Sequence, residues 1–277
     1  MIPLEDTAAD ILGKAQRGLG ISDSQLAARA GIAPERVRLL RDGDFDDETI
    51  GAVAPILGLD ASSLSKLAHN RWAPESVEAI SGLAQFNTIY DDMTVNAYLA
   101  WDPASRDAIA FDTGADCTPM LDRVKSENLT VKLILLTHAH PDHVADLARL
   151  QKATGARVYI SSRESASGAE TFEEGKRFEC GVLRIESRLT SGHSRGGMTF
   201  VVNGLARPIA VVGDSLFAAS MGGDAVSYED ALRNNREKIL TLPDETIVCP
   251  GHGPLTTVGK EKRENPFFAG LKLTVEV

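Results

Sequence analysis

The sequence predicts an α+β protein in two parts, a small all-α domain over residues 1–72 and a larger mixed domain over residues 77–277. Two observations predict this division. Up to about residue 70, small apolar residues recur at spacings of three and four, the helical period, without any alternating β-branched stretch. From residue 77 onward, short apolar strands alternate with amphipathic helices. A length of 277 residues suits a small domain joined to a medium one.

Five short helices are expected in the first part. Apolar residues at helical spacing mark the first helix, at Ile11, Leu12, Ala15 and Leu19. Ser22 and Gln25 have the spacing of a capping box at the start of the second helix, and Gly31 ends it. Pro34 suits the first turn of a third helix. Two more helices and a linker follow, at residues 46–57, 61–68 and 70–74.

In the second part, short apolar runs bounded by turn residues predict the strands, and longer amphipathic runs predict the helices. The strand candidates are Val77–Leu83, Thr94–Trp101, Ala108–Asp112, Leu133–Thr137, Arg157–Ile160, Leu183–Arg188, Met198–Val202, Ile209–Gly213 and Ile247–Cys249. The helix candidates are Met120–Glu127, Val144–Thr154 and Tyr228–Leu240.

The charge balance argues against a protein whose main work is to neutralise phosphate. The chain has 29 Lys plus Arg against 39 Asp plus Glu, a net charge of −10, whereas a general nucleic-acid coat needs an excess of cations. Its 43% hydrophobic residues are ordinary for a globular protein. We therefore expect a packed globular protein and no general nucleic-acid coat.

The number and spacing of the cysteines, together with the first ten residues, indicate the cellular compartment in which the protein is expected. The three cysteines lie far apart without a C-x-x-C pair, at Cys117, Cys180 and Cys249, so neither a disulfide scaffold nor a thiolate zinc site is indicated. Glu5, Asp6 and Asp10 stand where a signal peptide needs basic residues, and no window approaches 18 uninterrupted apolar residues. The sequence predicts a cytoplasmic protein that neither crosses nor binds a membrane.

Four side chains able to bind a metal lie within six residues after one predicted strand. His138, His140, Asp142 and His143 follow Leu133–Thr137, and a helix is expected just after them. Imidazole and carboxylate are good ligands for zinc and for other borderline metals, and a loop between strand and helix can turn alternate side chains toward one point. A lone histidine is more often a core or surface residue, but this density predicts a metal site.

Three further features stand at strand ends in the second half of the chain. His193 lies in a glycine-rich loop, Asp214 follows a strand that ends at Gly213, and His252 lies between two glycines. Each of them alone is weak, since such residues commonly form turns. Together they place every histidine except His69 in a loop suited to a ligand, and this concentration strengthens the metal hypothesis.

In order and spacing, these four motifs resemble those of the metallo-β-lactamase-fold hydrolases, over roughly residues 77–277. The resemblance implies an αββα sandwich with a dinuclear centre. It implies that one metal is held by His138, His140 and His193, a second by Asp142, His143 and His252, and both by Asp214. The ligand types suit zinc, which we expect, but they suit iron and manganese as well.

Within that superfamily the sequence looks most similar to the glyoxalase II-like branch, which comprises homologues of hydroxyacylglutathione hydrolase. The matching stretches are Asn96–Leu99, Phe111–Gly114, Gly213–Phe217, Pro250–Thr257 and Glu264–Phe267. The resemblance implies hydrolysis of a small thioester or a related acyl compound, in which a metal-bridging hydroxide attacks the carbonyl. It names no substrate-binding residue in this chain.

Two aspartates receive further roles. Asp142 is expected to act catalytically as a proton relay as well as a ligand. Asp112 ends a neighbouring strand, and we expect it to accept the outer N–H of a ligating histidine, although an Asp before Thr-Gly also commonly forms a turn. Neither Ser194 nor Ser215 lies in a nucleophile elbow, so serine catalysis is not predicted.

Residues 22–59 resemble the helix-turn-helix of the Cro/repressor type. The resemblance would place Arg36 and Arg38 on the helix that enters the DNA major groove. The charge disagrees, because residues 1–72 hold eight Lys plus Arg against eleven Asp plus Glu, where a DNA-binding domain is usually basic. Dimerisation into a homodimer, or cover for the larger domain, is the competing role.

Three functions stay open at this point. The first is the dinuclear hydrolase with a small-molecule acyl substrate. The second is a DNA-binding regulator that uses the metal domain as a sensor, and the third is a mononuclear-iron persulfide dioxygenase. The complete set of ligands favours the hydrolase, because a sensor has less need of a site that generates hydroxide.

Overall fold

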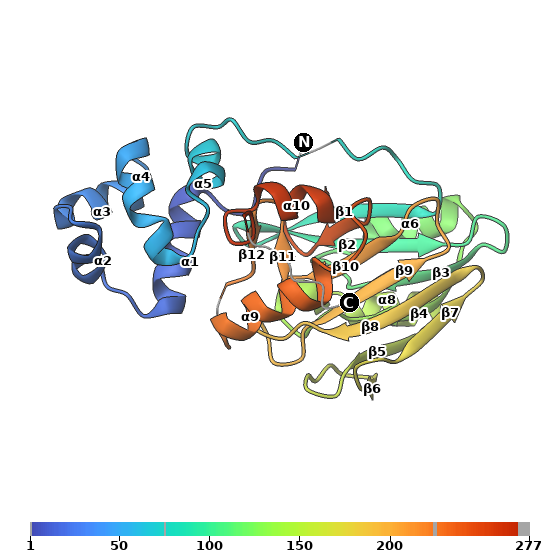
Figure 1. Ribbon diagram of the computed structural model, residues 1–277. Coiled ribbons are helices and arrows are strands. Elements are labelled where there is room, and N and C mark those ends of the chain that lie inside the picture. The colour runs from blue at the N-terminus through green and yellow to red at the C-terminus, as the bar shows by residue number, and fades with distance from the viewer. Residues whose placement is uncertain (1, 75, 224–225, 271–277) are drawn as a thin grey trace.

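The computed structural model describes residues 2–74, 76–223 and 226–270. Two six-stranded sheets pack face to face with helices on both outer sides, and a group of short helices lies at one end (Figure 1). The four-layer αββα sandwich expected from the sequence is therefore confirmed, and so is the all-helical region before it. Within the described ranges, no helix is long and apolar enough to cross a membrane.

The first sheet has its strands in chain order: β1 (Leu83–Tyr90), β2 (Met93–Trp101), β3 (Asp107–Phe111), β4 (Thr130–Leu135), β5 (Arg157–Ser161) and β6 (Ala169–Phe172). The pairs β1–β2 and β2–β3 are antiparallel, and the pairs from β3 to β6 are parallel. Helices α6 (Thr118–Ser126) and α8 (Leu147–Thr154) cover its outer face, where Met120 and Leu150 pack against strand residues such as Ile134.

The second sheet runs in the order β14 (Thr256–Thr257), β13 (Ile247–Pro250), β10 (Ile209–Gly213), β9 (Met198–Asn203), β8 (Leu183–Leu189) and β7 (Arg177–Cys180). Its pairs are antiparallel except β10–β13. Along β10, Ile209 and Val211 point into the core between the sheets, while Ala210 and Val212 point to the opposite side. Because both faces are covered, this strand is apolar throughout.

The outer face of the second sheet is covered by α9 (Tyr228–Asn234), continued as a π-helical turn (Asn235–Ile239), and by α10 (Val258–Glu264). The small hairpin of β11 (Leu216–Phe217) and β12 (Ser220–Met221) lies at the same end of the molecule as these helices (Figure 1). Ile239 and Val258 are fully buried against Val212 and Val248 of the sheet.

The N-terminal region contains α1 (Ala8–Leu19), α2 (Asp23–Ala30), α3 (Pro34–Arg41), α4 (Asp47–Val53), a 3₁₀ turn (Pro55–Leu57) and α5 (Ala61–Ala68). The capping box of Ser22 and Gln25 is confirmed, because each side chain bonds the other's backbone N–H. Pro55 ends the expected helix over 46–57 early, since proline supplies no N–H to an α-helical turn.

Two expectations from the sequence were wrong. Residues 77–82 form no strand; the first strand is β1, an edge strand whose partly exposed, polar residues give no apolar run. The helix expected over Val144–Thr154 begins instead at α7 (Pro141–Val144) and is interrupted before α8. The interruption is at Asp146, whose backbone dihedral angles are not those of an α-helix and whose carboxylate accepts the Cys117 N–H.

Candidate metal centre

The four motifs of the sequence meet at one end of the sandwich because the strands that carry them end there. β4 leads into the loop of His138 and His140, β10 ends next to Asp214, β13 ends just before His252, and His193 lies between β8 and β9. Seven side chains form two groups with closely spaced ligand atoms: His138, His140, His193 and Asp214 in the first, and Asp142, His143 and His252 in the second.

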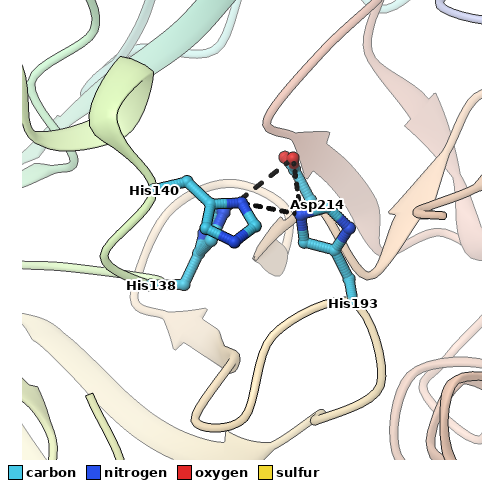
Figure 2. A group of neighbouring side chains, drawn as sticks. All are labelled: His138, His140, His193 and Asp214. Carbon is cyan, nitrogen blue, oxygen red and sulfur yellow. Dashed lines mark hydrogen bonds and ion pairs between the residues drawn. The ribbon is translucent and has the colours of Figure 1, made fainter. Parts of the chain in front are cut away.

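In the first group, three imidazoles and one carboxylate point toward one another (Figure 2). His193 Nε2 lies 3.0 Å from His140 Nδ1 and 3.3 Å from Asp214 Oδ2. His138 Nε2 lies 3.9 Å from the same carboxylate oxygen. His138 and Asp214 are buried, whereas His140 and His193 are partly open to solvent, so the group is reached from the side of these two histidines.

The second group lies on the other side of Asp214. Asp142 Oδ2 is 3.4 Å from His143 Nε2 and 3.3 Å from His252 Nε2. Asp214 reaches this group as well, with Oδ1 at 3.2 Å from His143 Nε2 and Oδ2 at 3.3 Å from His252 Nε2. The carboxylate of Asp214 therefore stands between the two groups and is shared by them.

The outer nitrogens of three histidines donate to carboxylate or backbone carbonyl oxygens. Because a carbonyl or carboxylate only accepts, Nδ1 carries the proton in His143, which donates to Asp112 Oδ2 at 2.9 Å, and in His252, which donates to the Thr94 carbonyl at 2.7 Å. His193 Nδ1 donates to the Gly223 carbonyl at 3.2 Å in the same way. These bonds leave the Nε2 lone pairs aimed inward, the usual arrangement behind metal-binding histidines.

Asp112 is the centre of a small hydrogen-bond network. It is buried, and its carboxylate accepts from the Thr137 N–H and hydroxyl, both at 2.7 Å, as well as from His143. Since the Thr137 hydroxyl donates to Asp112, it accepts from His138 Nδ1, 3.0 Å away. One carboxylate therefore orients a histidine of each group.

Several supporting contacts were not expected from the sequence. Asn96 donates to the carbonyls of Pro250 and Gly253, at 2.9 and 2.8 Å, and the Tyr98 hydroxyl donates to Pro250 at 2.7 Å, so β2 holds the loop of His252. The match of Asn96–Leu99 to the hydrolase family was the only indication of this role. The backbone carbonyls of Thr94 and Gly223 leave no trace in a sequence at all.

Charges in the centre shift the pKa values in opposite directions. Burial is the largest single influence and disfavours the charged form of His143 and of His252. Asp214 acts together with Asp112 on His143 and together with Asp142 on His252, and these carboxylates outweigh burial and raise the two pKa values to about 10 and about 11. Burial lowers the pKa of His138, helped by the positive charge of nearby His143, and burial also lowers the pKa of His193. The pKa of Asp214 is well below its usual value because His143 and His252 outweigh its burial.

The residues present fit a pair of metal ions. His138 Nε2, His143 Nε2 and Asp214 Oδ1 are buried without a hydrogen-bond partner among the described residues, although buried polar atoms nearly always have one. His138 and Asp214 belong to the first group and His143 to the second, and a cation in each group would complete them. Gly251 leaves room for these side chains, because a Cβ there would overlap Asp214 Oδ1 and the His143 ring. Nitrogen and oxygen donors of this kind suit zinc, iron and manganese.

The two arginines proposed for DNA lie elsewhere. Arg36 and Arg38 are exposed on α3, where Arg36 pairs with Asp46 and Arg38 with Glu35. His69, the sixth histidine, bonds Asp47 at 3.0 Å at the end of α5 and takes no part in the centre. The partners of Arg36, Arg38 and His69 all lie within the helical region.

A family model described as the metallo-beta-lactamase superfamily matches residues 90–252. This range contains all seven side chains of the two groups and begins after the helical region of residues 8–68. The match therefore identifies the sandwich and its centre, while the helix-turn-helix identity of the helices stays a prediction.

Similar proteins cover the same part of the chain. The hydroxyacylglutathione hydrolase GloC of Haemophilus influenzae is 30% identical over 203 residues, 62% of this chain and 92% of that protein. The probable metallo-hydrolase YqgX of Bacillus subtilis is 31% identical over 189 residues, 60% of this chain and 89% of that protein. The crystal structure of TTHA1623 in a di-iron-bound form superposes with a TM-score of 0.54 and 29% identity, covering 66% of this chain and all of that one.

Proposed function

The chain belongs to the metallo-β-lactamase superfamily, and from this premise we propose that it is a dinuclear metal-dependent hydrolase of thioesters or related acyl compounds. The observation that carries the proposal is the position of Asp214. Its two carboxylate oxygens lie 3.2 Å from His143 and 3.3 Å from both His193 and His252, so a single side chain is within reach of two ions.

The ligands of the proposed centre divide as the two groups do. His138, His140 and His193 would hold one ion and Asp142, His143 and His252 the other, with Asp214 in reach of both. The buried nitrogens of His138 and His143, which have no hydrogen-bond partner among the described residues, support this assignment. The di-iron form of TTHA1623 supports two ions in a related chain.

Divalent ions held at these residues would make a hydroxide available near neutral pH and would polarise the substrate carbonyl. Residues around the ligands fix the orientation of the imidazole rings. Asp112 holds His143 by a direct hydrogen bond and His138 through the Thr137 hydroxyl, and such partners raise the basicity of a ligating imidazole. No side-chain nucleophile is needed in this scheme.

Asp142 is the proposed proton relay. Its side chain is 11% exposed, against 7% for Asp214 and 3% for Asp112, so it is the carboxylate of the centre that lies nearest to solvent. A carboxylate that touches both the centre and the solvent can take a proton from the attacking water and pass it to the leaving group.

The acyl specificity of the proposal is supported by the relatives. The similarity to the hydroxyacylglutathione hydrolase of Haemophilus influenzae extends over 92% of that protein, and it favours a thioester substrate. The leaving thiolate needs little protonation to depart, which suits a centre with one solvent-facing carboxylate. A matched oxygen ester, whose alkoxide is the poorer leaving group, is therefore expected to react more slowly.

The test is a metal analysis followed by an acyl-hydrolysis assay. Protein purified without added metal should hold about two divalent ions per chain by mass spectrometry, and it should release thiol from hydroxyacyl thioesters faster than alcohol from the matched esters. Removal of metal by a chelator should abolish both reactions. One iron per chain together with oxygen uptake on a persulfide would overturn the hydrolase in favour of a dioxygenase.

A further inference from the structure

The helical region is joined to the metal domain by one continuous apolar core. Ile11, Leu12 and Ala15 of α1 are fully buried in the same cluster as Val212 of the second sheet and Met221 of β12. In Figure 1, α1 lies against the end of the sandwich, close to the β11–β12 hairpin and α9. This packing holds α1 next to the strand segment that borders the metal centre.

A buried ion pair from the helical region reaches into that segment. Lys14 Nζ lies 2.5 Å from Asp6 Oδ2, and the two side chains are only 13% and 7% exposed. Lys14 also donates to the Met221 carbonyl at 3.0 Å, and Asp6 accepts from the Ser220 hydroxyl at 2.5 Å. The pair therefore binds both residues of β12, and the cost of leaving either charge alone keeps these contacts closed.

The chain that leaves β12 runs directly past the metal centre. Gly223 offers the carbonyl that accepts from His193 Nδ1. Gly222 packs so closely on Asp214 that a Cβ at this position would overlap the Asp214 carbonyl oxygen. A small displacement of residues 220–223 would thus move the hydrogen-bond acceptor of one proposed ligand and press on the backbone of another.

A second contact brings the same N-terminal segment to the other group of ligands. Glu5 Oε2 lies 3.9 Å from His252 Nδ1, and the backbone at Pro3 and Glu5 packs on Gly253. The stretch from Pro3 to Lys14 therefore borders both groups, although the family model begins only at residue 90.

We propose that Lys14 and Asp6 are positioning residues of the metal centre. Through Ser220 and Met221 they hold the segment whose Gly223 carbonyl orients His193, so the helical region supports the ligand geometry and does more than extend the core. The inference rests on the dinuclear centre of the proposed function but not on its substrate.

The experiment compares three variants of the full chain. Lys14→Met removes the cation and its bond to Met221, while Lys14→Arg keeps a cation at this place. Arg41→Met is the matched control, because Arg41 also ties two helices of this region together: it donates to Gln16 at 3.0 Å, and none of its hydrogen bonds among the described residues reaches 220–223. Zinc affinity is measured by competition with a chromophoric chelator.

The expected result is selective. Lys14→Met should weaken zinc binding at one of two sites by roughly 10–100-fold, the range found for groups that support metal ligands. Lys14→Arg should restore most of the affinity, and Arg41→Met should bind zinc like the unmodified protein. In the metal-free state, Lys14→Met should speed amide hydrogen exchange in residues 220–223 and remove the His193 Nδ1–H resonance, which a general loss of stability would not do selectively.

Other results would overturn the proposal. Unchanged zinc affinity and unchanged exchange in Lys14→Met would do so, and so would an equal loss in Arg41→Met. If Lys14→Met does not fold, the double variant Asp6→Asn/Lys14→Met leaves no charge buried alone and carries the same expectation. Zinc binding is measured without substrate, so a protein that binds two ions but cleaves no acyl compound contradicts the proposed function and leaves this inference standing.

Discussion

The two parts of the molecule use the same polar residue types in opposite ways. In the helical region, Asp46 and Asp60 accept backbone N–H groups at helix starts, and His69 is bonded to the exposed Asp47. In the sandwich, His143 and Asp214 are buried, and each carries an atom without a hydrogen-bond partner among the described residues. The first set makes its hydrogen bonds within the fold, whereas the second set lies in close ion pairs, with His143 Nε2 at 3.2 Å from Asp214 Oδ1, and it offers donor atoms that a metal could take up.

This contrast shows why composition alone says little about the site. A fold tolerates a buried polar atom without a partner only where another interaction compensates the lost hydration. The net charge of −10 divides into −3 for residues 1–72 and −7 for the remainder, and a pair of divalent cations would offset part of the second figure. The net charge of −3 on residues 1–72 is not associated with a group of metal ligands among the described residues.

The largest effect is expected at the residue shared by the two groups. Asp214→Asn removes the charge that both ions would share, so activity should fall by more than about 100-fold, beyond the range for groups that only support a ligand. At least one metal per chain should be lost, as measured by mass spectrometry together with thioester hydrolysis. Full metal occupancy with retained activity would remove the bridging role of Asp214.

The matched control for that change is the histidine outside the centre. His69→Ala should keep both metals and full activity, because the His69 side chain, at the end of α5, makes its only polar contact among the described residues with Asp47 of α4. A loss of metal in His69→Ala would break the contrast between the two parts of the molecule.

A smaller effect is expected behind the ligands. In Asp112→Asn, an NH2 group replaces one of the two oxygens that accept from the Thr137 N–H, the Thr137 hydroxyl and His143. At least one of these donors then faces another donor and the negative charge behind His143 is lost, so metal affinity should fall by roughly 10–100-fold. Asp116→Asn is the control, since Asp116 is an exposed aspartate that accepts from Thr118 at the start of α6. Equal metal affinity in the two variants would contradict the role given to Asp112.

Metal uptake should release protons. The pKa values of His143 and His252 are raised to about 10 and about 11, so both carry a second proton at pH 7 in the metal-free protein, and ligation must displace it. Because the raised pKa favours the protonated form, zinc affinity should increase as pH rises from 7 toward 9. Titration of zinc into weakly buffered protein with an indicator dye measures the release, and a titration without acidification would exclude this order of events.

The smallest effect is expected from DNA. Arg36 and Arg38 are already paired with Asp46 and Glu35, and the region around them is acidic, so no salt-dependent binding to duplex fragments is expected. Fluorescence anisotropy over a salt series checks this. The opposite result would be binding that weakens steeply with salt and is abolished by Arg36→Ala and Arg38→Ala. It would support the regulator hypothesis and a DNA-binding role for the helical region.

Local patterns were enough to find most of the longer elements and most of the candidate site, but the short strands β6, β7, β11, β12 and β14 and the helix α10 were not predicted. The strand-end motifs around His138, His193, Asp214 and His252 could be recognised because each lies in a short stretch of chain between regular elements. The prediction failed where packing overrides local preference. The edge strand β1 carries no apolar run, and the carboxylate of Asp146 interrupts a helix that periodicity alone would continue.

The sequence by itself determined which side chains are available as ligands and that two kinds of domain follow one another, because helical periodicity, caps and turn residues act over a few positions. Only the tertiary structure decided that Asp214 stands between two groups of ligands and that Lys14 holds the segment beside His193. These contacts join residues that are far apart in the chain, and the packing of β10, β12 and α1 brings them together.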